Sequence, residues 1–167
     1  VTSIPEGHET QAKHAPLPKV WQNLVEMAKA NPAKAWQDEF DQNFISVGRP
    51  IIILNGSFYM AGYLNERPLV EIRRALDAFG LESAEEISET EDHISALCEV
   101  MRYLIAGDDV EISNLTNQRV FFNDHIRPWH DDLFDAIDAV SEMRLYHSVA
   151  SLAREFLAIE GQGFDMI

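Results

Sequence analysis

Residues 68–80 read PLVEIRRALDAFG, and this stretch carries the clearest structural pattern in the chain. Pro68 suits the first turn of a helix, and Gly80 supplies the left-handed residue that commonly ends one. Between them, apolar side chains recur at helical spacing, at Leu69, Ile72, Leu76 and Phe79. The stretch therefore predicts an amphipathic helix that buries one face.

The same spacing continues on both sides of this helix. It predicts further helices over residues 17–31, 33–48, 89–105, 117–126, 129–141 and 146–160, with a short one beginning at Ser57. The apolar run at residues 51–54 has no second strand-like run as a partner, so we expect an extended loop there. We predict an all-α, single-domain bundle of six or seven helices over residues 17–167, with an acidic connector near residues 81–90 and a flexible arm at residues 1–16.

Composition limits the class of protein. The chain has 167 residues, a hydrophobic fraction of 46% and a formal charge of −15. Phosphate backbones and anionic lipid would repel this charge, so we expect neither a nucleic-acid partner nor stable membrane insertion. No apolar run approaches the ~20 residues that cross a bilayer, so we expect a cytoplasmic protein. The single cysteine, Cys98, lies on the apolar stripe of its predicted helix, and we expect it to be buried.

The sequence lacks the motifs of common catalytic chemistry. It contains no phosphate-binding glycine loop, no nucleophile elbow and no His-Glu-x-x-His. We therefore expect no catalytic residue, no resident cofactor and no metal, and we expect that the chain is not an enzyme.

The first of two notable clusters reads ETEDH at residues 89–93. As the start of a helix, its acids would complement the helix dipole, with Ser88 and Glu91 at capping-box spacing. In the alternative interpretation, Asp92 orients His93 and offers its carboxylate to an incoming guanidinium. Both interpretations stay open at this point.

The second cluster reads FFNDHIRPWH at residues 121–130. The simpler interpretation places its aromatic residues in the core. In the alternative, His125, Pro128 and Trp129 form one wall of a groove. A metal site assembled from Asp92, His93, His125 and His130 is a further alternative, which their spacing does not favour.

Both clusters resemble motifs of the TorD/DmsD/NarJ family, which are cytoplasmic chaperones for molybdenum-cofactor oxidoreductases. Residues 89–94, followed by Leu97 and Met101, are similar to the family's Glu-Pro-x-Asp-His motif, with Thr90 in the place of proline. The resemblance extends over about residues 36–165. Its other parts are a second signature, a Ser-x-Tyr segment and the last helix with its tail, at residues 118–129, 56–60 and 156–165.

This resemblance implies a function. The protein would be a dedicated cytoplasmic chaperone that binds the twin-arginine signal peptide and the apo form of a molybdopterin oxidoreductase, assists cofactor insertion and proofreads export. Family members begin with additional N-terminal helices, which the arm replaces here, so a homodimer formed by helix exchange is an alternative to a monomer. The implied peptide-binding residues are carboxylates for the arginines, aromatic groove walls and their neighbours: Glu89, Asp92, His93, Tyr59, Phe122, His125, Pro128 and Trp129.

Two other classes of function remain as alternatives. One is a helical adaptor that binds an amphipathic partner helix without a preference for arginine, and the other is a small metal-dependent helical enzyme. From the sequence, we expect Asp92→Asn to weaken peptide binding with little change in thermal stability. A core position for Trp129 predicts that Trp129→Ala loses ~3–5 kcal/mol of stability.

Overall fold

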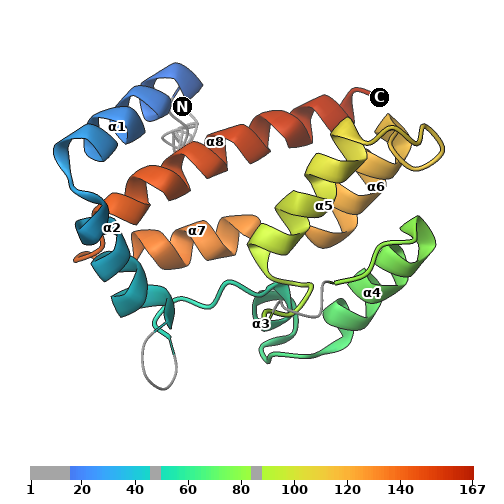
Figure 1. The fold of residues 1–167 in the computed structure, drawn as a ribbon, viewed down its shortest axis with the longest axis horizontal. Helices are drawn as coiled ribbons and strands as arrows, with labels where there is room; N and C mark the ends of the chain where they lie inside the picture. The colour runs from blue at the N-terminus through green and yellow to red at the C-terminus, as the bar shows by residue number, and fades with distance from the viewer. Residues whose placement is uncertain (1–15, 46–49, 84–87) are drawn as a thin grey trace, which may run out of the picture.

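The computed structural model describes residues 16–45, 50–83 and 88–167, and within these ranges it contains eight α-helices, one π-helix and no strand (Figure 1). The all-α, single-domain prediction is confirmed, although the helices outnumber the predicted six or seven. The predicted arm lies outside the described residues, apart from Pro16. The elements are α1 (Leu17–Ala30), α2 (Ala33–Phe40), η1 (Asp41–Ile45), α3 (Gly56–Ala61), α4 (Arg67–Phe79), α5 (Ile94–Ala106), α6 (Leu115–His125), α7 (His130–Asp138) and α8 (Leu145–Asp165).

Helix α8 is the longest element, and most of the other helices are arranged around it (Figure 1). Helix α1 packs along α8, α2 meets its N-terminal end, and α7 and α6 contact it from the other side. Helix α5 pairs with α6, while α4 contacts both α6 and α3. None of the helices in the described ranges is long and apolar enough to cross a membrane.

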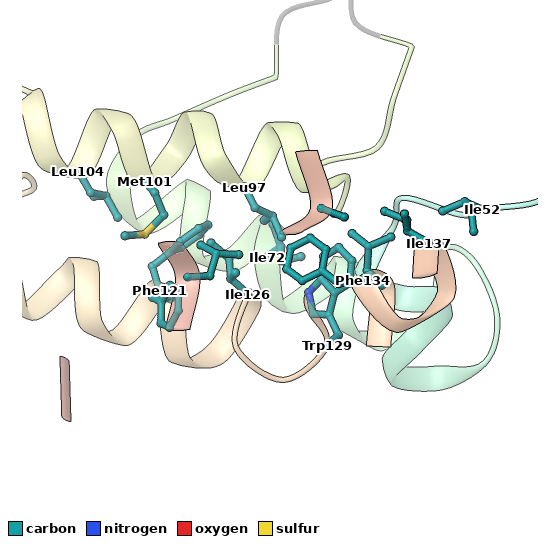
Figure 2. Packing of buried hydrophobic residues seen from close by; sticks show 14 of the residues in the cluster. Ile52, Ile72, Leu97, Met101, Leu104, Phe121, Ile126, Trp129, Phe134 and Ile137 are labelled. Carbon is teal, nitrogen blue, oxygen red and sulfur yellow. The ribbon is translucent and has the colours of Figure 1, made fainter. Parts of the chain in front are cut away.

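The hydrophobic core lies among α4, α5, α6 and α7, part of which Figure 2 shows, and it extends to the buried face of α8. Eight large side chains in it are at most 1% exposed: Leu97, Leu104, Phe121, Phe122, Ile126, Trp129, Leu133 and Met143. Full burial of a large apolar side chain contributes about 1.5–3 kcal/mol. This core therefore fixes the helices from which the candidate site is built.

Helix α4 confirms the prediction from residues 68–80. It ends at Gly80, whose φ of +67° is the left-handed conformation expected of a helix-ending glycine. Its buried face consists of Pro68, Leu69, Ile72 and Leu76.

The predicted helix over residues 33–48 changes type partway along. Helix α2 ends at Phe40, the chain continues as η1, and residues 46–48 lie outside the described part. The side-chain amide of Asn43 donates to the carbonyl of Glu39 at 2.7 Å, and such a bond to the backbone competes with the regular α-helical pattern. The Phe40 and Phe44 rings stack on each other across this change of helix type, with centroids 5.1 Å apart.

The N-terminus of α8 is capped from a distant part of the chain. The Glu39 carboxylate accepts hydrogen bonds from the backbone N–H groups of Arg144, Leu145 and Tyr146, at 2.8–3.0 Å. A carboxylate at this position pairs with donors that the helix leaves free and complements its dipole. The contact ties α2 to α8.

Helix α5 begins later than predicted. It starts at Ile94, and His93 is its N-cap, with Nδ1 accepting from the backbone N–H of Ser95 at 3.2 Å. The acids of residues 89–92 precede the helix. The first-turn interpretation of this cluster, including the capping box of Ser88, is therefore wrong.

The apolar stripe of α5 is also narrower than predicted. Cys98 is exposed rather than buried. It lies seven residues, or about two helical turns, before the exposed Ile105, so both occupy one outward side. The buried side chains of α5 are Leu97, Met101 and Leu104.

Candidate functional site

The start of α3 and the turn before α5 are joined at Asp92. Its Oδ2 accepts from the backbone N–H of Ser57 at 2.9 Å. Its Oδ1 accepts from Nδ2 of Asn55 at 3.0 Å and from the hydroxyl of Thr90. The backbone N–H of Gly56 donates to the Asp92 carbonyl at 2.9 Å. We call these five residues the Asp92 junction.

Asp92 is 1% exposed, and both of its carboxylate oxygens are occupied by donors of the same chain. Burial alone would raise the pKa of Asp92. The hydrogen bonds from Ser57, Thr90 and Asn55 together outweigh burial and hold this pKa below its usual value. One interpretation of the sequence made Asp92 an open acceptor for a guanidinium. In this structure its carboxylate instead links the start of α3 to the turn before α5.

Trp129 packs against the other side of the α3 start. A Cβ atom added at Gly56 would lie 2.9 Å from the indole, so only glycine permits this approach. The indole Nε1 donates to the carbonyl of His125 at 2.7 Å, and the Tyr59 ring stacks on the indole with centroids 5.5 Å apart. Trp129 points into the core in Figure 2, so the core interpretation is confirmed for this residue.

Phe122 belongs to the interior, and Tyr59 is partly buried against the core. Phe122 is buried and packs against Phe164. The Tyr59 hydroxyl donates to the carbonyl of Ile53 at 2.7 Å. Burial, with a smaller effect from Asp132, raises the pKa of Tyr59 to about 12.

His125 and Pro128 lie elsewhere, in a hollow of about 510 Å³ between α4 and α6. Glu71 and Asp124 line the same hollow. Burial lowers the pKa of His125, although these two carboxylates act in the opposite direction. The predicted site residues are thus divided among the core, this hollow and a second groove.

The second groove, which we call the α3 groove, has a volume of about 970 Å³ and contains Glu89 and His93 in its lining. Tyr63 is 73% exposed and Leu64 49% exposed, so the groove presents apolar surface to solvent. Its apolar walls come from η1, the segment after it and the end of α3, and include Phe44, Ile52, Phe58, Tyr63 and Leu64.

His93 contributes to both the groove and the helix that follows it. Burial lowers the pKa of His93, whereas the charges of Glu89 and Asp92 raise it by less. The imidazole is therefore neutral at pH 7. A neutral ring that accepts at Nδ1 carries its proton on Nε2, which leaves one hydrogen-bond donor for a ligand.

Sequence reasoning missed most of the groove walls. Tyr63 and Leu64 follow Gly62, whose φ of +83° ends α3 and turns the chain. The available signal for this part of the groove was a pair of large apolar residues directly after a helix-ending glycine, but the pair belongs to no known motif. Phe44 was predicted only as one residue of a longer helix.

The four residues considered for a metal site do not come together. Asp92 is held in its junction, and the His130 ring packs against Phe134 with centroids 5.8 Å apart. Across the part of the chain that the structure describes, no group of three His, Cys, Asp or Glu side chains could hold a metal ion.

Comparison with known proteins gives one result. The family model described as nitrate reductase delta subunit matches residues 10–135, which is more than half of the chain. The matched part includes the Asp92 junction, the α3 groove and Trp129. No curated protein and no solved structure matches the chain.

Proposed function

Because the chain belongs to the nitrate reductase delta subunit family, a family of molybdoenzyme maturation chaperones in the TorD/NarJ group, we propose that it is a dedicated cytoplasmic chaperone of one molybdopterin oxidoreductase. It binds the twin-arginine signal peptide and the apo form of the catalytic subunit. Binding assists cofactor insertion and delays export until the cofactor is in place. The chaperone itself performs no chemical step.

The α3 groove is the observation that carries this proposal. A signal peptide combines basic residues with an apolar stretch, and the groove combines exposed apolar walls with Glu89 and His93. Burial of apolar surface contributes roughly 25 cal/mol for each Å² removed from water. The groove therefore suits the apolar stretch of the peptide, while Nε2 of His93 donates to a peptide carbonyl.

The negative charges support the same ligand. The formal charge of −15 attracts a basic peptide before contact, within the ~8 Å over which charges act at physiological salt. At contact, Glu89 offers an exposed carboxylate to a guanidinium, which binds carboxylates through paired hydrogen bonds. In this proposal Asp92 positions the turn that carries Glu89 and His93 and does not touch the peptide.

Titration of a fluorescently labelled twin-arginine peptide, followed by anisotropy, tests the proposal. Tyr63→Ser and Leu64→Ser each remove exposed apolar surface from the groove, and we expect each to raise Kd about fivefold. Val110→Ser is the matched control, because Val110 is 78% exposed and does not line the groove. Equal losses in all three variants would contradict the proposal.

The peptide arginines separate a chaperone from a general helical adaptor. Replacing both arginines by lysine, and then by glutamine, should weaken binding in two steps, because lysine keeps the charge but not the planar fork. An adaptor that recognises only an amphipathic helix would bind all three peptides with similar Kd values.

A further inference from the structure

A second groove, which we call the α4/α5 groove, lies between the end of α4, the residues after it and the first turns of α5. Its volume is about 440 Å³. Its apolar lining includes Leu76, Leu81, Val100 and Tyr103. Its polar lining is dominated by four glutamates, Glu82, Glu89, Glu91 and Glu99.

Two of these four carboxylates are already paired. Glu91 binds Arg73 at 2.9 Å, and Glu99 binds Arg102 at 2.8 Å. Within the ranges that the structure describes, neither Glu82 nor Glu89 has an ion-pair partner, and both are exposed. Among the described residues, the groove therefore combines an apolar lining with two unpaired carboxylates, which complement two cations on aliphatic stems.

The α4/α5 groove and the α3 groove share one residue, Glu89. The two grooves therefore adjoin at Glu89, where a single extended ligand would pass from one to the other. Both grooves expose mainly apolar surface, so the carboxylates decide the placement of the ligand. Its cations fit the α4/α5 groove, where Glu82 adds to Glu89, and its apolar stretch fits the α3 groove. The opposite placement would leave Glu82 without a cation and put charged groups against Tyr63 and Leu64.

We propose that the α4/α5 groove is the subsite for the two adjacent arginines of the signal peptide, with Glu82 and Glu89 each binding one guanidinium. The arginine stems lie over Val100 and Tyr103, and an aromatic ring is a favourable neighbour for a guanidinium. This inference rests on the proposed function. It adds the place of the arginines, and with it the direction in which the peptide lies.

A cycle of protein and peptide variants tests the subsite. Against the arginine peptide, we expect Glu82→Gln and Glu89→Gln each to raise Kd about tenfold, because each loses a charged hydrogen bond. Against the peptide with both arginines changed to glutamine, neither variant should alter Kd. Glu142→Gln removes the same charge from an exposed position outside both grooves, and we expect a change of less than about twofold at physiological salt.

Cross-linking gives an independent readout of direction. A benzophenone group placed beside the peptide arginines should cross-link to the segment that contains Val100 and Tyr103. A group placed at the far end of the apolar stretch should cross-link near Tyr63. The reverse pattern would overturn the inference, as would equal effects of Glu82→Gln on the two peptides.

The outcomes distinguish this inference from the proposed function. If the wild-type chain does not bind the arginine peptide, both are wrong. If it binds and Tyr63→Ser weakens binding while Glu82→Gln does not, the α3 groove is supported and the arginine subsite is refuted.

Discussion

Replacement of Asp92 by asparagine tests the role that the structure gives to this buried carboxylate. The change keeps the size of the side chain but leaves one acceptor oxygen where two oxygens accept three hydrogen bonds. The N–H of Ser57 belongs to the backbone and cannot reorient, so we expect the remaining oxygen to accept from it. The Thr90 hydroxyl can rotate to accept from the new amide. Asn55 then loses its hydrogen bond to residue 92 and keeps only the one that its Nδ2 donates to Thr90 Oγ1, at 2.9 Å.

The cost follows from this arrangement. One hydrogen bond to a charged acceptor is lost, at about 1.5–3 kcal/mol, and the others become weaker neutral bonds. We therefore expect Asp92→Asn to lower the free energy of unfolding by about 2–4 kcal/mol at pH 7, which replaces the sequence-based expectation of little change. Urea denaturation measures this difference. Asp108→Asn, which removes a charge from an exposed loop, is the control and should change it by less than about 0.5 kcal/mol.

The pH dependence gives a second and sharper test. The pKa of Asp92 is lower in the folded chain than the unfolded value of about 3.9. Its contribution is therefore complete above about pH 5 and is lost as pH falls through 3.9 toward the folded pKa. Asparagine has no such contribution, so the gap between wild type and variant should narrow below about pH 5. A gap of the same size from pH 7 to pH 3, or no gap at pH 7, would refute the reasoning.

Three further predictions concern the core and its charges. Trp129→Ala should lower the free energy of unfolding in urea by ~3–5 kcal/mol, because the indole is buried; a loss below 1 kcal/mol would contradict a core role. Gly56→Ala should cost about 1–3 kcal/mol in the same assay through its contact with the indole, whereas Gly163→Ala, which has open space on a helix, should stabilise by up to about 1 kcal/mol. Arg154→Ala should lower the thermal midpoint more at low salt than at 1 M salt, because Arg154 pairs with three aspartates of α7 whose exposed side chains are open to screening by salt; equal losses at both salt concentrations would contradict an ionic role.

Most of the fold follows from local sequence signals. Helix α4 has regular apolar spacing between Pro68 and Gly80, so its existence and both ends could be read directly. The start of α5 could not be predicted in this way, because acidic residues before a helix and acidic residues in its first turn look alike in sequence. The Asp92 carboxylate accepts a hydrogen bond from Ser57, 35 residues earlier, and only the tertiary structure reveals such a partner.

The candidate site was predictable only in part. The motifs around Asp92 and Trp129 do meet, through Gly56, which contacts both. Their exposure was not predictable, because an aromatic residue of a groove wall and one of the core have the same helical spacing. The groove walls at Tyr63 and Leu64 depend on how the chain turns after α3, and this turn leaves no repeating pattern.

The cap that Glu39 provides for α8 has a consequence for the order of assembly. Helix α2 leads directly into η1, which forms one wall of the α3 groove, and its anchor is the backbone of residues 144–146. These residues are translated about a hundred codons after Glu39. The ribosome must therefore have delivered residues 144–146 before that wall is fastened, so the groove of the nascent chain is complete only after the first turn of α8 has emerged.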